Sequence, residues 1–250
     1  MLALDVALVT DRGGRKVNED ACGHWHSDRQ LCCVLADGAG GHGGGDLASK
    51  LAVSELIGRF STAPTRDADA LGALVQQTNA ALIDHKKAGT PSADMHSTAV
   101  CLVIDFVAHQ AHWAHAGDSR LYWMRDGRVH RRTRDHSLVQ MMVDAGTLAE
   151  EGMMDHPQRS HLRSALGVAP EHLLVSSAAS DGPVQSGDVF MLCTDGLWEY
   201  MADTALEQTL QASHSARDWL EKLGTTVMAA PARKANHDNF TALVVWVAAA

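Results

Sequence analysis

The chain has 250 residues, of which 46% are hydrophobic and 20% are charged, and this composition is typical of a globular protein with a sizeable core. Its 30 acidic and 21 basic residues give a formal net charge of −9. This acidic balance argues against non-specific nucleic-acid binding, which depends on Lys and Arg at the phosphates, and is compatible with carboxylates gathered around cations.

The first half of the chain contains a strand, two helices and two further strands in the predicted order. In sequence these are a strand over 31–36, helices over about 46–60 and 69–87, and strands over 98–106 and 110–116. The first strand is a continuous apolar run, which is typical of a buried strand, and it ends at Asp37 before a glycine-rich loop. The first helix is predicted because apolar residues recur at i, i+4 spacing.

The second half of the chain also consists of blocks of strands and helices. Its predicted elements are strands over 121–124, 173–177, 189–193 and 240–247, helices over about 203–212 and 215–229, and a helix followed by a mobile connection over 137–155. Asp126-Gly127 is a favourable hairpin turn. Because strands and helices come in blocks, we predict an α+β fold in which helices pack on antiparallel sheets, with residues 1–250 forming a single domain.

The five cysteines predict free thiols. Their number is odd, no pair has CxxC spacing, and four of them lie in apolar runs: Cys32, Cys33, Cys101 and Cys193. The first ten residues contain Asp5 and no basic segment, so they do not resemble a signal peptide, and no apolar stretch reaches the ~20 residues that a membrane-spanning helix needs. We therefore expect a cytoplasmic monomer that binds neither membranes nor nucleic acid.

Acidic residues flank apolar strands at four widely separated places. Asp37, Asp118 and Asp195 each follow a predicted strand, and Asp238 comes just before the last one. Strand ends can bring carboxylates together at one sheet edge, where they repel unless they are protonated or neutralised by a cation. An all-oxygen cluster suits Mg²⁺, Mn²⁺ or Ca²⁺. Any one of these aspartates alone is better explained as a turn residue, but four together favour a metal site.

Six short motifs are spread over nearly the whole chain. They are RKVNED at 15–20, ADGAGGH at 36–42, GDSR at 117–120, DHS at 135–137, TDGLW at 194–198 and DNFT at 238–241. In identity and order they resemble the motifs of the PPM (PP2C-like) family of metal-dependent Ser/Thr protein phosphatases. The run 195–201 further resembles phosphatases associated with type VI secretion, which oppose a Ser/Thr kinase.

This resemblance implies a four-layer αββα fold, in which an antiparallel β-sandwich is flanked by α-helices and carries a binuclear Mn²⁺ or Mg²⁺ centre at one end. On the matching positions, Asp37 would bridge both ions, and Asp195 and Asp238 would complete the first site. The carbonyl of Gly38 would serve the second. The implied reaction is hydrolysis of phosphoserine and phosphothreonine in proteins by a metal-activated water.

The resemblance also implies roles around the two ions. Asp20 would hold ion-bound water, and Asp118 would contribute to a possible third ion site. Arg15 would bind the substrate phosphate, because a guanidinium offers a planar fork of donors. His42 is the candidate general acid for the leaving alkoxide, since its pKa lies near the working pH. A surface role for this loop histidine has nearly equal weight, and a metal-bound water could donate the proton instead.

Two segments depart from the family pattern or leave it open. Residues 96–98 read HST where the family usually has GTT, which puts the local loop in doubt. The segment expected to form a flap, residues 141–165, is short and rich in methionine. The sequence therefore leaves the substrate preference open.

The strongest rival enzyme class is a dinucleotide-dependent one. Glycines at 38, 40 and 43 form G-x-G-x-x-G after a strand and before a helix, which is the Rossmann fingerprint. Against it, Asp37 would repel a pyrophosphate and the loop continues for two further glycines. The acidic residue about 20 positions on, Glu55, lies in the middle of a predicted helix instead of at a strand end.

A non-catalytic, phosphatase-like binding module is the second alternative. A degenerate member of the family should lack the metal aspartates. Asp37, Asp195 and Asp238 are all present, which favours activity.

Overall fold

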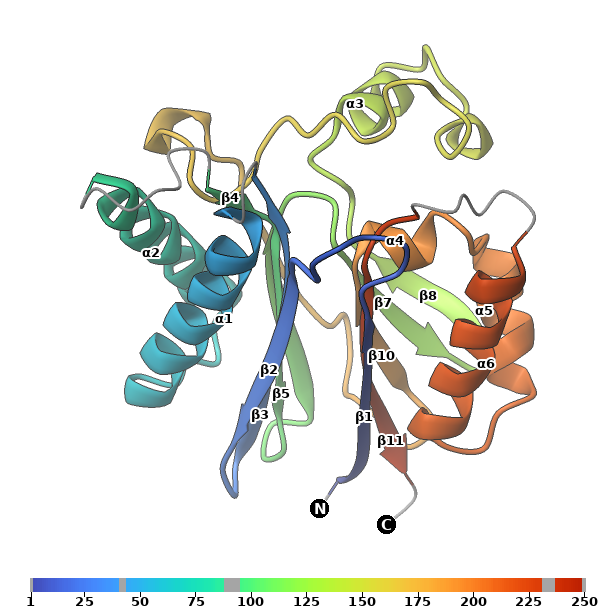
Figure 1. The fold of residues 1–250 in the computed structure, drawn as a ribbon. Helices are drawn as coiled ribbons and strands as arrows, with labels where there is room; N and C mark the ends of the chain where they lie inside the picture. Colours follow the sequence, from blue (N-terminus) through green and yellow to red (C-terminus); the bar gives the residue numbers. More distant parts are fainter. Residues whose placement is uncertain (1, 41–43, 88–94, 231–236, 249–250) are drawn as a thin grey trace.

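Two antiparallel sheets form the centre of the molecule, and helices cover their outer faces (Figure 1). The structure, a computed structural model, describes residues 2–40, 44–87, 95–230 and 237–248. One sheet contains, in spatial order, β1 (Ala3–Asp11), β11 (Phe240–Ala248), β10 (Val189–Cys193), β7 (Arg120–Arg125) and β8 (Arg128–Arg132). The other contains β2 (Asp20–His26), β3 (Gln30–Ala39), β5 (Ala99–Asp105), β6 (Gln110–Ala116) and β9 (Ser176–Ala179), and the short β4 (His96–Ser97) pairs with β3.

The outer helices complete four layers. On one side α1 (Gly44–Thr62) packs on β2 and β3, and α2 (Ala68–Lys87) packs on β6 and β9. On the other side α6 (Ala216–Ala229) packs on β1 and β11, and α5 (Asp203–Gln211) packs on β8. All strand pairs in both sheets of the described chain are antiparallel. The predicted αββα sandwich is therefore confirmed, and the parallel sheet that a Rossmann enzyme requires is ruled out.

Three apolar layers hold the sandwich together, one between the sheets and one under each helix pair. On β3, Val34 faces α1 and α2, whereas Leu35 faces the opposite sheet. Because successive side chains of a strand point to opposite faces, a strand covered on both faces reads as one continuous apolar run. This explains why the central strands were visible in the sequence.

Most predicted elements are confirmed within a few residues, including the strands at 110–116 and 189–193. The hairpin turn is also confirmed, since Asp126 and Gly127 have φ of 52° and 70°. The predicted strand at 173–177 is shifted in the structure, because a 3-10 helix, η3 (Pro170–His172), precedes it and the strand begins at Ser176.

The segment after residue 137 has the predicted order of a helix and then a connection, whereas two edge strands were not predicted. The helix α3 (Leu138–Asp144) ends before Gly146, whose φ is 69°, and the connection contains the 3-10 helix η2 (Glu150–Gly152). The edge strands β1 and β2 had no prediction, because each is only partly buried and its apolar signal is weak. Within the described ranges, no helix has the length and apolarity that a bilayer crossing requires.

Candidate active site

Acidic side chains from both sheets line one cavity of about 330 Å³ at an end of the sandwich. The predicted site residues that line it are Arg15, Asp37, Gly38, Asp118, Asp195 and Asp238. Asp20 lies behind this lining, and His42 falls outside the described residues. Four carboxylates predicted from distant motifs therefore share one cavity.

Strand pairing explains how these distant residues meet. Asp37 lies near the end of β3, and Asp118 lies in the connection from β6 to β7. Asp195 is the first residue of the short helix α4 (Asp195–Trp198), directly after β10. Asp238 precedes β11, which pairs with β10 in the register Cys193↔Ala242. Because β10 and β11 are neighbouring antiparallel strands, Asp195 and Asp238 lie at the same end of one sheet.

Two glycines permit the close approach of the segments that carry these aspartates. A Cβ on Gly38 would lie 2.0 Å from the carbonyl oxygen of Gly45, so a side chain there would push β3 away from the start of α1. A Cβ on Gly196 would lie 1.9 Å from the carbonyl oxygen of Asn239. Both positions require glycine because a neighbouring backbone occupies the space of a side chain.

Burial and mutual repulsion raise the pKa of three of the clustered carboxyls, those of Asp37, Asp118 and Asp195. Desolvation is the largest cause for Asp37, whose pKa lies well above its ordinary value, and Asp195 is the strongest charged neighbour. Desolvation, followed by Asp118, raises the pKa of Asp195 in the same way. For Asp118, desolvation raises the pKa to about 7, with Asp135 adding to the rise and Arg120 opposing it. A cation in this cavity would relieve both the repulsion and the burial of charge.

Asp20 supports the cavity from the β2 side. It lies opposite Asp37 in the β2–β3 ladder, and its Oδ2 accepts a hydrogen bond of 3.0 Å from Thr194 Oγ1. Desolvation raises the pKa of Asp20 to about 7. Its Oδ1 and the Oδ1 of Asp195 are buried acceptors that have no hydrogen-bond partner among the described residues. An all-oxygen donor set with orphaned carboxylate oxygens fits a hard divalent cation.

The side chains as placed do not themselves form a coordination sphere. Within the described ranges, no three His, Cys, Asp or Glu side chains make a group that could hold one ion. Asp238 instead accepts a hydrogen bond of 2.6 Å from Arg15 Nη2. The chemistry of the donors fits cations, whereas ligation by a common ion would need the carboxylates to turn further into the cavity.

The sequence model of the family described as protein phosphatase 2C matches residues 12–237. The chain belongs to the protein phosphatase 2C family. The serine/threonine phosphatase stp of Listeria monocytogenes is 32% identical over 243 residues, which cover 94% of this chain and 93% of that protein.

Solved structures of phosphatase 2C relatives have the same fold. The catalytic domain of the serine/threonine phosphatase PstP, in complex with two manganese ions, has a TM-score of 0.78 at 27% identity and covers 100% of both chains. PppA, described as a key regulatory component of T6SS in Pseudomonas aeruginosa, has a TM-score of 0.75 at 33% identity, covering 98% of this chain and 97% of PppA.

The departure from the family's GTT pattern leaves the support of the acidic cavity intact. Thr98 Oγ1 accepts a hydrogen bond of 2.9 Å from the backbone N–H of Asp37. Ser97 Oγ donates to the carbonyl oxygen of Asp37 at 3.0 Å. Two hydroxyl side chains thus hold the backbone of Asp37, so the doubt raised by residues 96–98 does not extend to this aspartate.

Six lining residues of this phosphatase 2C were not predicted as site residues: Glu19, Ala39, Gly40, Thr98, Ser160 and Leu162. Glu19 lines the cavity, and its pKa is raised first by burial, with Arg15 opposing the rise. Its place between Arg15 and Asp20 in the first motif was a signal that could have identified it. Ser160 and Leu162 come from the flap, which leaves the sandwich at the same end as α4 (Figure 1). No local pattern marked these two, because only the return of the chain places them over the cavity.

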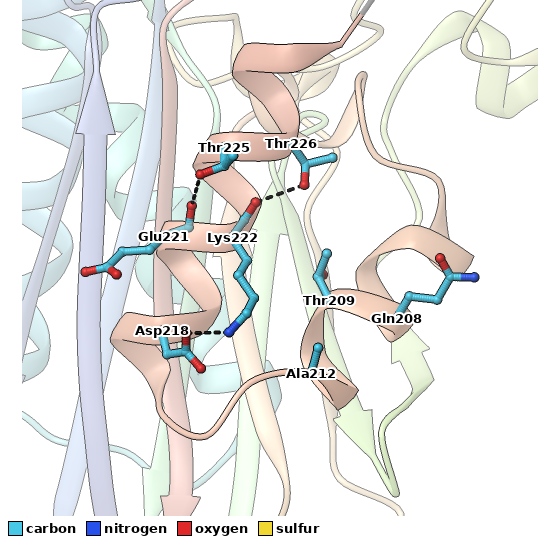
Figure 2. A pocket seen from close by; sticks show the side chains of 8 residues that line it. All are labelled: Gln208, Thr209, Ala212, Asp218, Glu221, Lys222, Thr225 and Thr226. Carbon is cyan, nitrogen blue, oxygen red and sulfur yellow. Dashed lines mark hydrogen bonds and ion pairs between the residues drawn. The ribbon is translucent and has the colours of Figure 1, made fainter.

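A second cavity, between α5 and α6, lacks the features of a phosphatase site. Its volume is about 430 Å³, and Figure 2 shows three of its lining side chains, those of Lys222, Thr225 and Thr226, paired within α6. Lys222 contacts Asp218, Thr225 Oγ1 donates to the carbonyl oxygen of Glu221 at 2.8 Å, and Thr226 makes the equivalent bond one residue later. The acidic cavity is therefore the candidate active site of this family member.

Proposed function

We infer that this chain is a metal-dependent protein phosphatase that hydrolyses phosphoserine and phosphothreonine in proteins. Its membership of the protein phosphatase 2C family supports this function. The single observation that carries it is the meeting of Asp37, Asp118, Asp195 and Asp238 in one cavity. The donors are all oxygen, and burial together with like charges raises the pKa of Asp37, Asp118 and Asp195, a repulsion that divalent cations would relieve.

The ligand assignments are part of the proposal. Asp37 would be shared by two ions, Asp195 and Asp238 would complete one site, and the Gly38 carbonyl would serve the other. The PstP relative with two manganese ions supports a pair of ions. Mn²⁺ or Mg²⁺ suits these ligands, and Asp118 would contribute to a third, weaker site.

The protein's own residues would bind and orient the phosphoryl group. When bound, a pair of divalent cations supplies an activated water and neutralises charge on the transferred group. Arg15 would donate hydrogen bonds to phosphate oxygens from its planar guanidinium. An ion at Asp238 would compete with Arg15 for the carboxylate of Asp238. Asp20, opposite Asp37 in the β2–β3 ladder, would orient water through its Oδ1, which has no hydrogen-bond partner among the described residues. Protonation of the leaving oxygen by His42 stays a prediction.

The relatives and the free thiols support a proposal for the partner and the cellular compartment of this phosphatase. We propose that the phosphatase opposes a cognate Ser/Thr kinase, and PppA supports a role in type VI secretion. We further propose that it acts as a monomer in the cytoplasm. All five cysteines are free, and Cys32, Cys33, Cys101 and Cys193 are buried, which suits a reducing compartment.

The test is hydrolysis of a phosphothreonine peptide with Mn²⁺, with a chelator, and by the variant Asp195→Asn. We expect the chelator to abolish activity and Asp195→Asn to lower kcat/KM at least about a thousandfold, since ion-based charge stabilisation contributes several kcal/mol. Asp126→Asn, at a hairpin turn that does not line the cavity, is the matched control and should retain activity. Full activity in the chelator or in Asp195→Asn would refute the metal mechanism.

A further inference from the structure

Trp198 links two of the candidate ligands through one short helix. It is the last residue of α4, whose first residue is Asp195. The side chain of Trp198 is 2% exposed, and its indole Nε1 donates a hydrogen bond of 3.0 Å to the backbone carbonyl of Asp118. Its burial alone is that of an ordinary core residue. The structure adds a polar contact that joins segments 80 residues apart.

Arg120 fixes the orientation of this indole. Its guanidinium lies over the Trp198 ring, 3.6 Å from the centroid. The same guanidinium makes two hydrogen bonds to Asp135, of 2.9 and 2.8 Å, and a third of 3.0 Å to the hydroxyl of Tyr122. Arg120 is 5% exposed, so its charge is paired away from bulk water. The indole therefore lies under a side chain that is itself held at three points.

The connection that carries Asp118 is held from its other side as well. Gly117 has a φ of 104°, and its N–H donates to His136 Nδ1 at 3.2 Å. The hydroxyl of Ser119 lies 2.6 Å from that of Thr98. Neighbours therefore hold the residues before and after Asp118, while Trp198 holds the backbone of Asp118 itself.

We propose that Trp198 is a positioning residue for Asp118, fixing the distance between Asp118 and Asp195 through its N–H bond. Arg120 maintains the orientation of the indole that makes this bond possible. This inference rests on the proposed function, because it concerns the ions that these two aspartates would bind. Loss of the N–H should loosen Asp118 without removing any ligand, and so should weaken only the ion that Asp118 helps to bind.

The test compares Trp198→Phe with Trp219→Phe in the full chain. Trp219 is also fully buried, and its Nε1 donates one hydrogen bond of 3.0 Å to Thr209 Oγ1 in the helical layer. Both variants keep an aromatic ring and lose one indole N–H. Mn²⁺ binding to the metal-free protein is measured by calorimetry and by electron paramagnetic resonance, together with the melting temperature.

We expect Trp198→Phe to weaken the weakest Mn²⁺ site about fivefold to tenfold, the value of one hydrogen bond, and to leave the two tighter sites within about twofold. Trp219→Phe should bind Mn²⁺ like the wild type, even where its melting temperature falls. Asp118→Asn should weaken the same site, and adding Trp198→Phe to it should cause little further loss, because both changes act on one interaction.

Equal Mn²⁺ binding by the two tryptophan variants would overturn the proposal, as would a wild-type protein that binds only two ions. If Trp198→Phe does not fold, Arg120→Lys replaces it, since lysine keeps the charge but loses the planar contact with the indole. The same weak site should then lose affinity, and unchanged binding would overturn the proposal. Failure of the proposed function is distinguishable, because the wild type would then show no metal-dependent hydrolysis at all.

Discussion

Arg15 lines the acidic cavity and contacts Asp238, one of the proposed ion ligands. It is half exposed and pairs with the equally accessible carboxylate of Asp238 at 2.6 Å. Exposed ion pairs contribute at most about 1 kcal/mol, so a phosphate can draw Arg15 from Asp238 at little cost. The structure therefore places the guanidinium at the mouth of the acidic cavity in a contact that is easily exchanged.

The kinetics of Arg15→Lys test this role. We expect KM for a phosphothreonine peptide to rise about tenfold, because lysine supplies a point charge in place of the bidentate hydrogen bonds of a guanidinium. Arg12→Lys is the matched control, since Arg12 is exposed and does not line the cavity. A KM for Arg15→Lys that matches the Arg12→Lys control would show that Arg15 does not contact the phosphate.

At the scale of elements, the short helix α4 depends on a close approach to the chain before β11. Gly196, its second residue, lies so near Asn239 that a Cβ would overlap the carbonyl oxygen at 1.9 Å. Asn239 is itself fixed, because its Nδ2 donates to the carbonyl oxygens of Arg12 and Val17 at 2.7 and 3.0 Å. A side chain at Gly196 would therefore move α4, and with it Asp195, away from Asp238.

Two alanine substitutions separate this steric effect from helix propensity. Gly196→Ala should lower the free energy of unfolding by more than about 1 kcal/mol, because the added methyl group meets fixed backbone. Gly224→Ala, in α6, meets nothing within 4 Å and should raise it by up to about 1 kcal/mol. Urea denaturation measures both, and a stabilised Gly196→Ala would contradict the close approach.

At the scale of the whole molecule, the sandwich gathers like charges in one place, and this gives the metal-free protein a pH dependence. Asp118 has an ordinary pKa of 3.8 and a folded pKa of about 7. Between these values the folded chain keeps a proton that the unfolded chain releases. Its contribution to stability therefore falls as the pH rises from about 4 to 7, and stays low above 7.

The variant Asp118→Asn should not lose this stability as the pH rises, because asparagine does not ionise. In chelator, the stability of the variant relative to the wild type should increase by on the order of a few kcal/mol between pH 4.5 and pH 7.5. Urea denaturation at the two pH values gives the difference, and contributions from histidines cancel in it. Asp126→Asn should show no such increase, and a constant difference for Asp118→Asn would contradict the raised pKa.

The sequence by itself determined the central strands, the outer helices and the set of aspartates. The apolar runs at β3, β5 and β10 are local signals, because each strand is covered on both faces. The six motifs are local too, so the acidic residues could be named before any contact was known. His42, named with them, lies outside the described residues.

Only the tertiary structure decided what these residues touch. The edge strand β1 pairs with β11 from the far end of the chain, and such a half-buried strand carries little apolar pattern of its own. The pairing of Arg15 with Asp238 and the bond from Trp198 to Asp118 join segments 223 and 80 residues apart. A local pattern records the propensity and burial of its own residues, whereas such contacts depend on how two packed sheets bring separate strand ends together.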